Sequence, residues 1–278
     1  MKSPMTVEAF APAKINLTLH VTGRRDDGYH LLDSLVMFAD VGDRLRITPA
    51  PKTILRVSGP LSQGVPTDDS NLVIRAANLI GATAEIELEK HLPNAAGIGG
   101  GSSDAGTILR VLRNITGTPV QDNGLSLGAD VPVCMHAKAA RMRGIGEHII
   151  PLDHLPTLEA LLVNPMVAVP TGPVFRILET PNNPPMPDTI PADLDAPAFA
   201  DWLGQMRNDL EVPAITVEPA VTATLNALNA TQDCLLSRMS GSGATCFGLY
   251  PDATTAKNAA ARLQSNYPNW WIRSTRLS

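Results

Sequence analysis

Strict alternation of apolar and polar residues predicts a strand in the stretch AKINLTLHV, residues 13–21. A period of two sends successive side chains to opposite faces, so one face is predicted to be buried and the other polar. The apolar positions are Ile15, Leu17, Leu19 and Val21, and the polar positions are Lys14, Asn16, Thr18 and His20. Such a polar stripe is unusual on the first strand of a domain.

A turn and further strands are predicted in the first half of the chain. The segment GRRDDGYH, residues 23–30, contains a DG turn signal, and LLDSLVMF, residues 31–38, is predicted to return as a second strand. DRLRIT, residues 43–48, and AEIELEK, residues 84–90, also alternate and are predicted strands.

A glycine-rich stretch, LPNAAGIGGGSSDAGTILRVL at residues 92–112, leads into a predicted helix. The apolar side chains that share one face of this helix, at helical spacing, are Ala105, Ile108, Leu109 and Leu112. Ser102, Ser103 or Asp104 is predicted to cap the first turn. The stretch therefore combines a glycine loop with a helix N-terminus.

The second half of the chain is also predicted to mix helices and strands. Residues 180–197 are rich in proline and lack periodicity, so we expect a long surface loop there. The elements expected beyond it are helices over residues 199–210 and 217–228, a strand at 246–250, a helix over 256–263 and a strand at 270–275. The fold class is therefore α+β, with an expected boundary between a domain of residues 1–155 and a domain of residues 156–278.

Composition narrows the class of protein. Of the 278 residues, 44% are hydrophobic and 18% are charged, which is typical of globular proteins and argues against disorder. A net charge of −5 gives no basic surplus for binding nucleic acid. No signal-peptide core and no run of about 18 apolar residues is present, so we expect a cytoplasmic protein that does not bind membranes. The cysteines, expected to be reduced packing residues, are Cys134, Cys234 and Cys246.

The glycine loop before the predicted helix has the chemistry of an anion site. Glycines let backbone N–H groups approach a ligand, and a helix N-terminus adds unpaired N–H groups and the positive end of its dipole. Phosphate fits such a site best, and Ser102 and Ser103 add hydroxyl donors or, at Ser102, a ligand for phosphate-bound Mg²⁺. A tight, flexible connection between elements is the structural alternative.

Three common phosphate-binding patterns do not match this loop. No lysine follows the glycines as the Walker pattern GxxxxGK[ST] requires. The dinucleotide pattern GxGxxG is met at Gly97 and Gly99 but not at Ser102, and the strand before it alternates instead of being apolar on both faces. The sequences HRD and DFG are absent, which argues against a protein kinase.

Four motifs in order resemble the GHMP kinases, the superfamily of the galactokinase, homoserine, mevalonate and phosphomevalonate kinases. They are PAKINLTLHVTGRRDDGYHLLDSL from residue 12, LPNAAGIGGGSSDA from residue 92, LGADVPV from residue 127 and RMSGSGATCFGLY from residue 238. The resemblance implies a two-domain fold, with an N-terminal domain like domain 2 of ribosomal protein S5 and a ferredoxin-like C-terminal domain. It also implies a phosphotransferase that uses ATP and Mg²⁺.

The segment GRRDDGYH resembles those GHMP kinases that phosphorylate the 2-hydroxyl of a cytidine diphosphate sugar alcohol in non-mevalonate isoprenoid (terpenoid) biosynthesis. Asp130, in GADVPV, matches the family's catalytic aspartate, and Lys14, in PAKIN, matches its catalytic lysine. A carboxylate near the acceptor hydroxyl takes its proton, and an ammonium offsets charge on the transferring group. Taken alone, Asp130 could cap or turn the chain, and Lys14 could be a solvated charge.

The resemblance also implies two sets of binding residues. The nucleotide set is Pro93, Asn94, Ala95, Ala96, Gly97, Ile98, Gly99, Gly100, Gly101, Ser102 and Ser103. The substrate set is Asn16, Tyr29, His30, Phe175, Gly241, Ser242 and Gly243. The start LPNAAGI departs from the family's usual loop, and residues 113–128 are short for the helical hairpin expected there. Neither change touches Lys14, Asp130 or the three consecutive glycines, so we expect activity to survive with altered nucleotide affinity.

Two other functions stay open at this level. Another GHMP kinase would act on a mevalonate-like alcohol and would not bind cytidine. A nucleotide-binding sensor would keep the glycine loop without catalysis, although the presence of both Lys14 and Asp130 argues against it. In each case we expect a small-molecule ligand, no nucleic-acid partner, and a monomer or weak homodimer.

Overall fold

The computed structural model describes residues 5–278, in two compact units that interleave along the sequence. The first unit is formed by residues up to Lys14 together with 41–94 and 99–137, and the second by residues 15–40, 95–98 and 138–278. Two long strands, β1 (Val7–Asn16) and β3 (His30–Pro49), pass from one unit into the other. Residues 1–4, part of the segment in which no signal peptide is expected, lie outside the described residues. The domain boundary after residue 155 stays a prediction.

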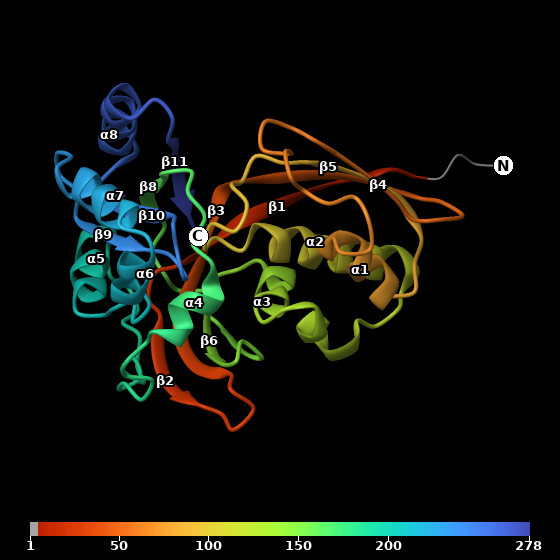
Figure 1. Cartoon of the computed structure of the whole chain (residues 1–278), viewed down its shortest axis with the longest axis horizontal. Helices are drawn as coiled ribbons and strands as arrows, with labels where there is room; N and C mark the ends of the chain where they lie inside the picture. Colours follow the sequence, from red (N-terminus) through yellow and green to blue (C-terminus); the bar gives the residue numbers. More distant parts are fainter. Residues whose placement is uncertain (1–4) are drawn as a thin grey trace. The chain divides into compact units, whose positions relative to one another are not determined.

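The first unit packs two helices on a small sheet (Figure 1). Its further elements are β4 (Ile54–Ser58), α1 (Leu72–Leu79), β5 (Ala84–Glu89), α2 (Gly100–Thr116), the 3₁₀ segment η1 (Gln121–Leu127) and α3 (Val131–His136). Strand β5 pairs in parallel with β4 and antiparallel with the second half of β3. Alternate residues of these strands, such as Leu45 and Ile86, are buried with apolar residues of α1 and α2 in one core.

Helix α2 buries the face that its spacing predicts, since Ala105, Ile108, Leu109 and Leu112 are at most 1% exposed. The predicted serine or aspartate cap is wrong. The N-cap is Gly99, whose φ of 65° is left-handed and which gives no side-chain cap bond. Because the helix begins at Gly100, Ser103 and Asp104 lie within its first turns, where both are buried.

The second unit contains the ferredoxin-like order of elements that the resemblance implies. Its strands β11, β8, β10 and β9 pair antiparallel in that order, with helices inserted between β8 and β9 and between β10 and β11. Figure 1 shows α7 and α8 with these strands, and their apolar faces share one core. The elements are β2 (His20–Arg24), β6 (Ala140–Gly144), β7 (His148–Pro151), β8 (Leu158–Asn164), α4 (Thr171–Arg176), α5 (Ala196–Gly204), α6 (Glu211–Val217), α7 (Ala220–Asn229), β9 (Leu236–Met239), β10 (Cys246–Tyr250), α8 (Ala253–Asn266) and β11 (Trp271–Leu277).

The predicted strand over residues 13–21 is interrupted, because β1 ends at Asn16 and β2 begins only at His20. Its polar face is not exposed, which corrects the expectation of a half-buried strand. The polar residues Lys14, Asn16, Thr18 and His20 are at most 3% exposed. Burial is possible because each of these side chains meets a polar partner from another segment of the chain.

The ends of other strands and helices also differ from the predicted ones. DRLRIT is the second half of β3 and not a separate strand. The helix expected over 199–210 ends at Gly204, and the one expected over 217–228 is divided by Pro219, which is the N-cap of α7. Residues 180–195 lack regular structure as predicted, although Met186 within this loop is buried.

The three cysteines are unpaired, as expected, and Cys134 and Cys246 are buried. Within residues 5–278, no helix combines the length and the apolar character needed to span a bilayer.

Candidate active site

Lys14 and Asp130 meet in the first unit. The Lys14 ammonium donates to Oδ2 of Asp130 over 2.7 Å, and the two side chains are 4% and 32% exposed. Asp130 occupies the N-cap position of α3, but its carboxylate makes no capping bond. The lysine is therefore not a solvated charge, and the aspartate side chain is not a helix cap. The carboxylate stays accessible to a ligand while the ammonium beneath it is buried.

Gly99 allows Lys14 to lie against the start of α2. A Cβ built at Gly99 would lie 3.3 Å from Cβ and 3.5 Å from Cε of Lys14, and 3.6 Å from Sγ of Cys134. Its left-handed φ also favours glycine. The first N–H groups of α2 have no partner within the helix, so this unit places a helix end with free N–H donors beside a buried ammonium.

The loop at residues 95–98 packs on the predicted loop of Gly241, Ser242 and Gly243 within the second unit. A Cβ at Gly97 would collide with the backbone of Ser240 and of Gly243. The Ser240 hydroxyl donates to the Gly97 carbonyl and accepts from the Asn16 backbone N–H, each over 3.0 Å. Ser240, which sequence reasoning did not select, thus links two predicted loops.

The Asn16 side chain has an unpaired acceptor. Its Nδ2 donates to the Ser34 hydroxyl over 2.8 Å, whereas its Oδ1 is buried and has no hydrogen-bond partner. Buried polar atoms are normally paired, so an unpaired amide oxygen at a predicted substrate residue is suited to accept a ligand hydroxyl.

Two of the three predicted aromatic positions stack on each other. The rings of His30, at the start of β3, and Phe175, on α4, have centroids 4.8 Å apart and planes inclined by 24°. Burial, and then the charge of Arg24, lowers the pKa of His30 below its ordinary value, so its ring is neutral near pH 7. Tyr29 is 59% exposed at the preceding turn. The second unit thus holds a stacked pair of rings, the aromatic cluster, next to the exposed Tyr29.

The remaining predicted residues differ in exposure. Pro93, Ala96 and Ile98 are buried, whereas Asn94 and Ala95 are exposed. Ser103 is fully buried and donates to the Pro12 carbonyl over 2.7 Å, so its hydroxyl is already used. Ser242 pairs with Thr171 through hydroxyls 2.8 Å apart. Gly100, Gly101 and Ser102 keep partial or full exposure at the first turn of α2.

Sequence reasoning missed a buried charge cluster under this helix. The Lys90 ammonium donates to Asp43 and, over 2.8 Å, to Oδ2 of Asp104, and all three residues are at most 2% exposed. Burial would lower the pKa of Lys90, but the two carboxylates outweigh it and raise that pKa. Burial, reinforced by Asp43 and opposed by Lys90, raises the pKa of Asp104 to about 7. The sequence signal was an aspartate inside an apolar helix face.

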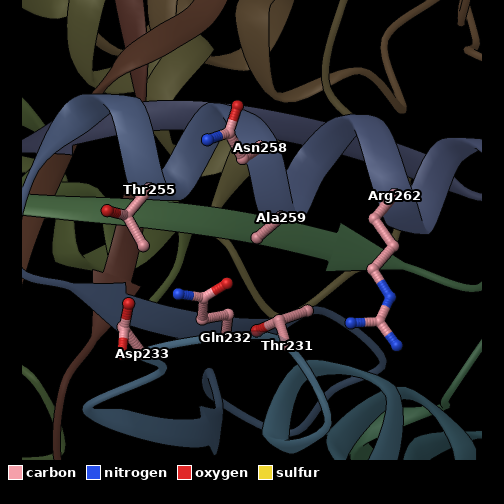
Figure 2. A pocket seen from close by; sticks show the side chains of 7 residues that line it. All are labelled: Thr231, Gln232, Asp233, Thr255, Asn258, Ala259 and Arg262. Carbon is pink, nitrogen blue, oxygen red and sulfur yellow. The ribbon is translucent and has the colours of Figure 1, made fainter.

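A further pocket lies in the second unit and is lined by none of the predicted residues. Figure 2 shows it between α8 and the segment after α7. It is lined by Thr231, Gln232, Asp233, Thr255, Asn258, Ala259 and Arg262.

Comparison with known proteins identifies the family. The family described as GHMP kinases N terminal domain matches residues 71–140, and that described as GHMP kinases C terminal matches residues 192–269. A relative in Dinoroseobacter shibae, 4-diphosphocytidyl-2-C-methyl-D-erythritol kinase, is 54% identical over 272 residues, which cover 98% of this chain and 95% of that protein. The chain belongs to the GHMP kinase family. It is therefore a kinase, and kinases of this family use ATP.

Further relatives of this GHMP kinase agree. A protein of the same name in Cereibacter sphaeroides is 53% identical over 275 residues, covering 98% of this chain and 99% of that relative. A crystal structure of 4-(cytidine 5'-diphospho)-2C-methyl-D-erythritol kinase is 33% identical with a TM-score of 0.78, and covers 98% of this chain and 99% of that one. A homoserine kinase from Cytophaga hutchinsonii, 17% identical with a TM-score of 0.62 over 98% of this chain and 94% of its own, shares the fold. The predicted α+β GHMP fold is confirmed.

Proposed function

We propose that this GHMP kinase transfers the γ-phosphoryl group of ATP to the 2-hydroxyl of 4-diphosphocytidyl-2-C-methyl-D-erythritol. The observation that carries the choice of substrate is the identity of more than half, over nearly the whole chain, to relatives that bear the name of that kinase. The segment GRRDDGYH supports the same choice.

Lys14 and Asp130 are the proposed catalytic residues. The acceptor oxygen bonds to the γ-phosphorus, the bond from that phosphorus to the β,γ-bridging oxygen breaks, and ADP leaves. Asp130 takes the hydroxyl proton, a contribution of roughly 10²–10⁴-fold in rate. The Lys14 ammonium lies 2.7 Å from Oδ2 of Asp130 and offsets negative charge on the transferring group. Because this transfer is loose, positioning by the pair counts as much as basicity.

The start of α2 is the proposed phosphate site, with N–H donors from Gly100 and Gly101 and the Ser102 hydroxyl. Among residues 5–278, no group of three or more His, Cys, Asp or Glu side chains is placed to hold a metal. Mg²⁺ in kinases is held largely by substrate phosphates and one or two protein ligands, so these residues fit a metal that arrives with the nucleotide. Ser102 is its proposed protein ligand, and the metal would neutralise phosphate charge.

The proposed acceptor residues are in the second unit. Tyr29, His30 and Phe175 would contact the cytosine ring, and the unpaired Oδ1 of Asn16 would accept a hydrogen bond from a hydroxyl of the sugar alcohol. Gly241, Ser242 and Gly243 would supply backbone and hydroxyl donors.

The test is ADP release by the purified protein with ATP and Mg²⁺, comparing the cytidine substrate with homoserine and mevalonate. We expect turnover with the cytidine substrate alone, and phosphorus NMR should place the new phosphate at its 2-position. Turnover with another alcohol would reject the substrate but keep the family. ATP binding without any turnover would favour a nucleotide sensor.

A further inference from the structure

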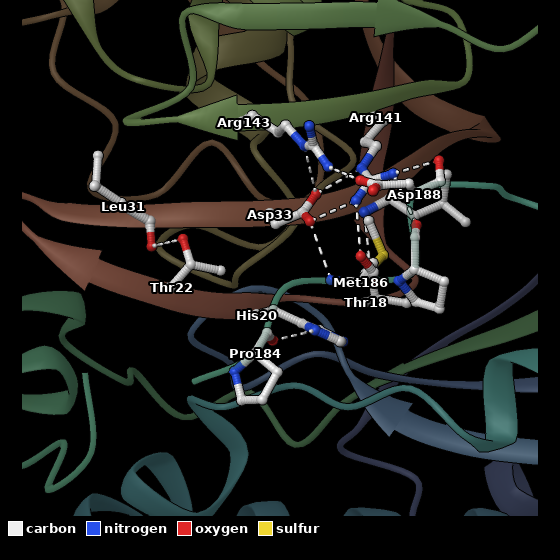
Figure 3. Close-up of polar contacts among 12 residues, drawn as sticks. Thr18, His20, Thr22, Leu31, Asp33, Arg141, Arg143, Pro184, Met186 and Asp188 are labelled. Carbon is white, nitrogen blue, oxygen red and sulfur yellow. Dashed lines mark hydrogen bonds and ion pairs between the residues drawn. The ribbon is translucent and has the colours of Figure 1, made fainter. Parts of the chain in front are cut away.

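The proline-rich loop between α4 and α5 is fixed to the sheet by one buried arginine. Arg141, on β6, donates from Nε and Nη2 to the two carboxylate oxygens of Asp33 on β3, over 2.8 and 2.6 Å. Its other N–H groups donate to the carbonyls of Met186, Pro187 and Asp188 over 3.1, 2.9 and 3.0 Å. Figure 3 shows these contacts. All five guanidinium donors are therefore used, two on the carboxylate and three on the loop.

Met186 of this loop makes two further hydrogen bonds. The Met186 backbone N–H donates to Oδ2 of Asp33 over 3.1 Å, and its sulfur accepts from the Thr18 hydroxyl over 2.9 Å. Arg141, Asp33 and Met186 are at most 3% exposed. Burial would raise the pKa of Asp33, but Arg141 outweighs it and lowers that pKa, so the carboxylate is charged near neutral pH. We call Asp33, Arg141 and the carbonyls of residues 186–188 the latch.

A second attachment precedes the latch along the loop. The backbone N–H of Asn183 donates to the Val21 carbonyl over 3.0 Å, and the Pro184 carbonyl accepts from Arg207 and lies 3.2 Å from Nδ1 of His20. The loop is thus bonded to β2 as well as to β3 and β6. It is a fixed strap and not a free connection.

The strap joins the two segments that carry the aromatic cluster. Phe175 lies at the end of α4, directly before the loop, and His30 begins β3, three residues before Asp33. Both rings, the latch and the loop belong to the second unit. A shift of the loop against β3 would therefore act on the 4.8 Å separation of the rings from both sides. His30 lies three residues before Asp33 on β3, and Phe175 lies eleven residues before Met186 in the same connection.

We propose that Asp33 and Arg141 are positioning residues for the acceptor, because the latch holds the His30–Phe175 pair in the geometry that receives the nucleobase. This inference rests on the proposed function, in which a cytidine diphosphate substrate uses that pair. On this proposal the latch acts on the acceptor and not on ATP.

Arg143 provides a matched control on the same strand. Its guanidinium lies 3.5 Å from Oδ1 of Asp33 and 3.3 Å from Oδ1 of Asp188. The Arg143 side chain is 37% exposed and that of Asp188 is 96% exposed. The exposed pair of Arg143 and Asp188 contributes little. The contact of Arg143 with the buried Asp33 is longer than those of Arg141, which bonds both carboxylate oxygens, so removing Arg143 takes away charge near Asp33 without opening the latch.

The test compares Arg141→Lys, Asp33→Asn and Arg143→Gln in the full chain. Lysine keeps the charge of Arg141 but lacks the fork of donors. We expect the two latch variants to raise KM for the cytidine substrate about ten- to a hundredfold, with KM for ATP within about twofold, as for small misplacements of binding groups. Arg143→Gln should keep both KM values. An unchanged acceptor KM in a folded latch variant, or equal losses for both substrates, would overturn the proposal.

Proton NMR of the His30 imidazole separates this inference from the proposed function. Its signals are shifted by the Phe175 ring, and we expect that shift to be lost in Arg141→Lys and kept in Arg143→Gln. If the wild type does not phosphorylate the cytidine substrate, the proposed function fails. The comparison of His30 shifts between the variants still decides whether the latch holds His30 against Phe175. If the single variants do not fold, Asp33→Leu combined with Arg141→Met removes the buried charges together, and it should give the same loss of shift. A retained shift in that folded variant would overturn the proposal.

Discussion

At the scale of the residue, buried charges with single partners set the chemistry. Lys14 is 3% exposed, and its ammonium pairs with Asp130. A charge removed from water is costly unless it is paired, so the position of each side chain depends on the other. Replacing one carboxylate oxygen of Asp130 is therefore expected to disturb the pair.

Asp130→Asn keeps the shape of the side chain but removes the basic carboxylate. We expect turnover to fall roughly 10²–10⁴-fold, with the affinity for ATP within about twofold. Rates of ADP release and calorimetric titration with nucleotide measure the two quantities. Asp153→Asn, which neutralises an exposed carboxylate, is the control. Near-normal turnover of the Asp130 variant would show that Asp130 is not the base.

Asp104 gives a prediction for stability against pH. Its pKa rises from 3.8 in the unfolded chain to about 7 in the folded protein, so between these values the folded state binds a proton that the unfolded state has released. This contribution to the free energy of unfolding is complete below about pH 4 and is lost as the pH rises through about 7. Asp104→Asn does not titrate.

We therefore expect the free energy of unfolding of the wild type, minus that of Asp104→Asn, to decrease from pH 4 to pH 7. Urea denaturation at a series of pH values measures this difference. Asp153→Asn should show no such trend. A difference that stays constant over the range would mean that Asp104 is ionised throughout.

At the scale of the element, α2 connects backbone geometry to the site. Its ends are formed by Gly99 and Gly117, both left-handed, with φ of 65° and 73°. Their surroundings differ, because a Cβ at Gly99 would meet Lys14 and Cys134, whereas a Cβ at Gly117 would meet nothing within 4 Å. The two glycines are therefore matched in backbone conformation and differ in what they touch.

Comparing Gly99→Ala with Gly117→Ala distinguishes the effect of backbone strain from the effect of displacing Lys14. Each should lower stability by about 1–2 kcal/mol, because alanine is disfavoured in the left-handed region. Only Gly99→Ala should also lower turnover, since the new methyl group presses on Lys14. Thermal unfolding and initial rates measure the two effects. Equal turnover in both variants would contradict a role of Gly99 in placing the lysine.

At the scale of the whole molecule, the two compact units are not consecutive in sequence. The second unit takes residues 15–40 and 95–98 from the first half of the chain. Leu19 and Val21 are buried in the same core as Leu161 and Leu228, and Ala39 of β3 pairs with Leu277 of β11. The core of this unit therefore needs segments that the predicted boundary after residue 155 would remove.

A fragment of residues 156–278 tests that boundary. We expect it to lack cooperative unfolding, because it loses the apolar contacts of Leu19 and Val21 and the β3 edge of its sheet. The measurements are dispersion of its amide NMR signals and its urea unfolding curve, with the full chain as the reference. A well-dispersed spectrum would support the predicted domains.

Features with a local cause could be predicted. The buried face of α2, the strand β5 and the succession β10, α8, β11 follow from periods of two and 3.6 residues, and the turn after β2 follows from its DG signal. Helix ends were less predictable, because Gly99 and not a serine caps α2 and because Pro219 separates α6 from α7. At Gly99 the close approach of Lys14 and Cys134 favours glycine, whereas at Pro219 the proline itself interrupts the helix.

The sequence by itself determined the family, through four ordered motifs, and the character of the site as a glycine-rich helix start with a lysine and an aspartate. Only the tertiary structure decided that the polar stripe of the first strand is buried, that Lys14 pairs with Asp130, and that Arg141 holds the proline-rich loop on Asp33. The physical reason is that these polar groups are satisfied by partners outside their own element, such as Ser34 for Asn16 and Asp130 for Lys14, and a pairing between separate elements leaves no periodic trace in the sequence.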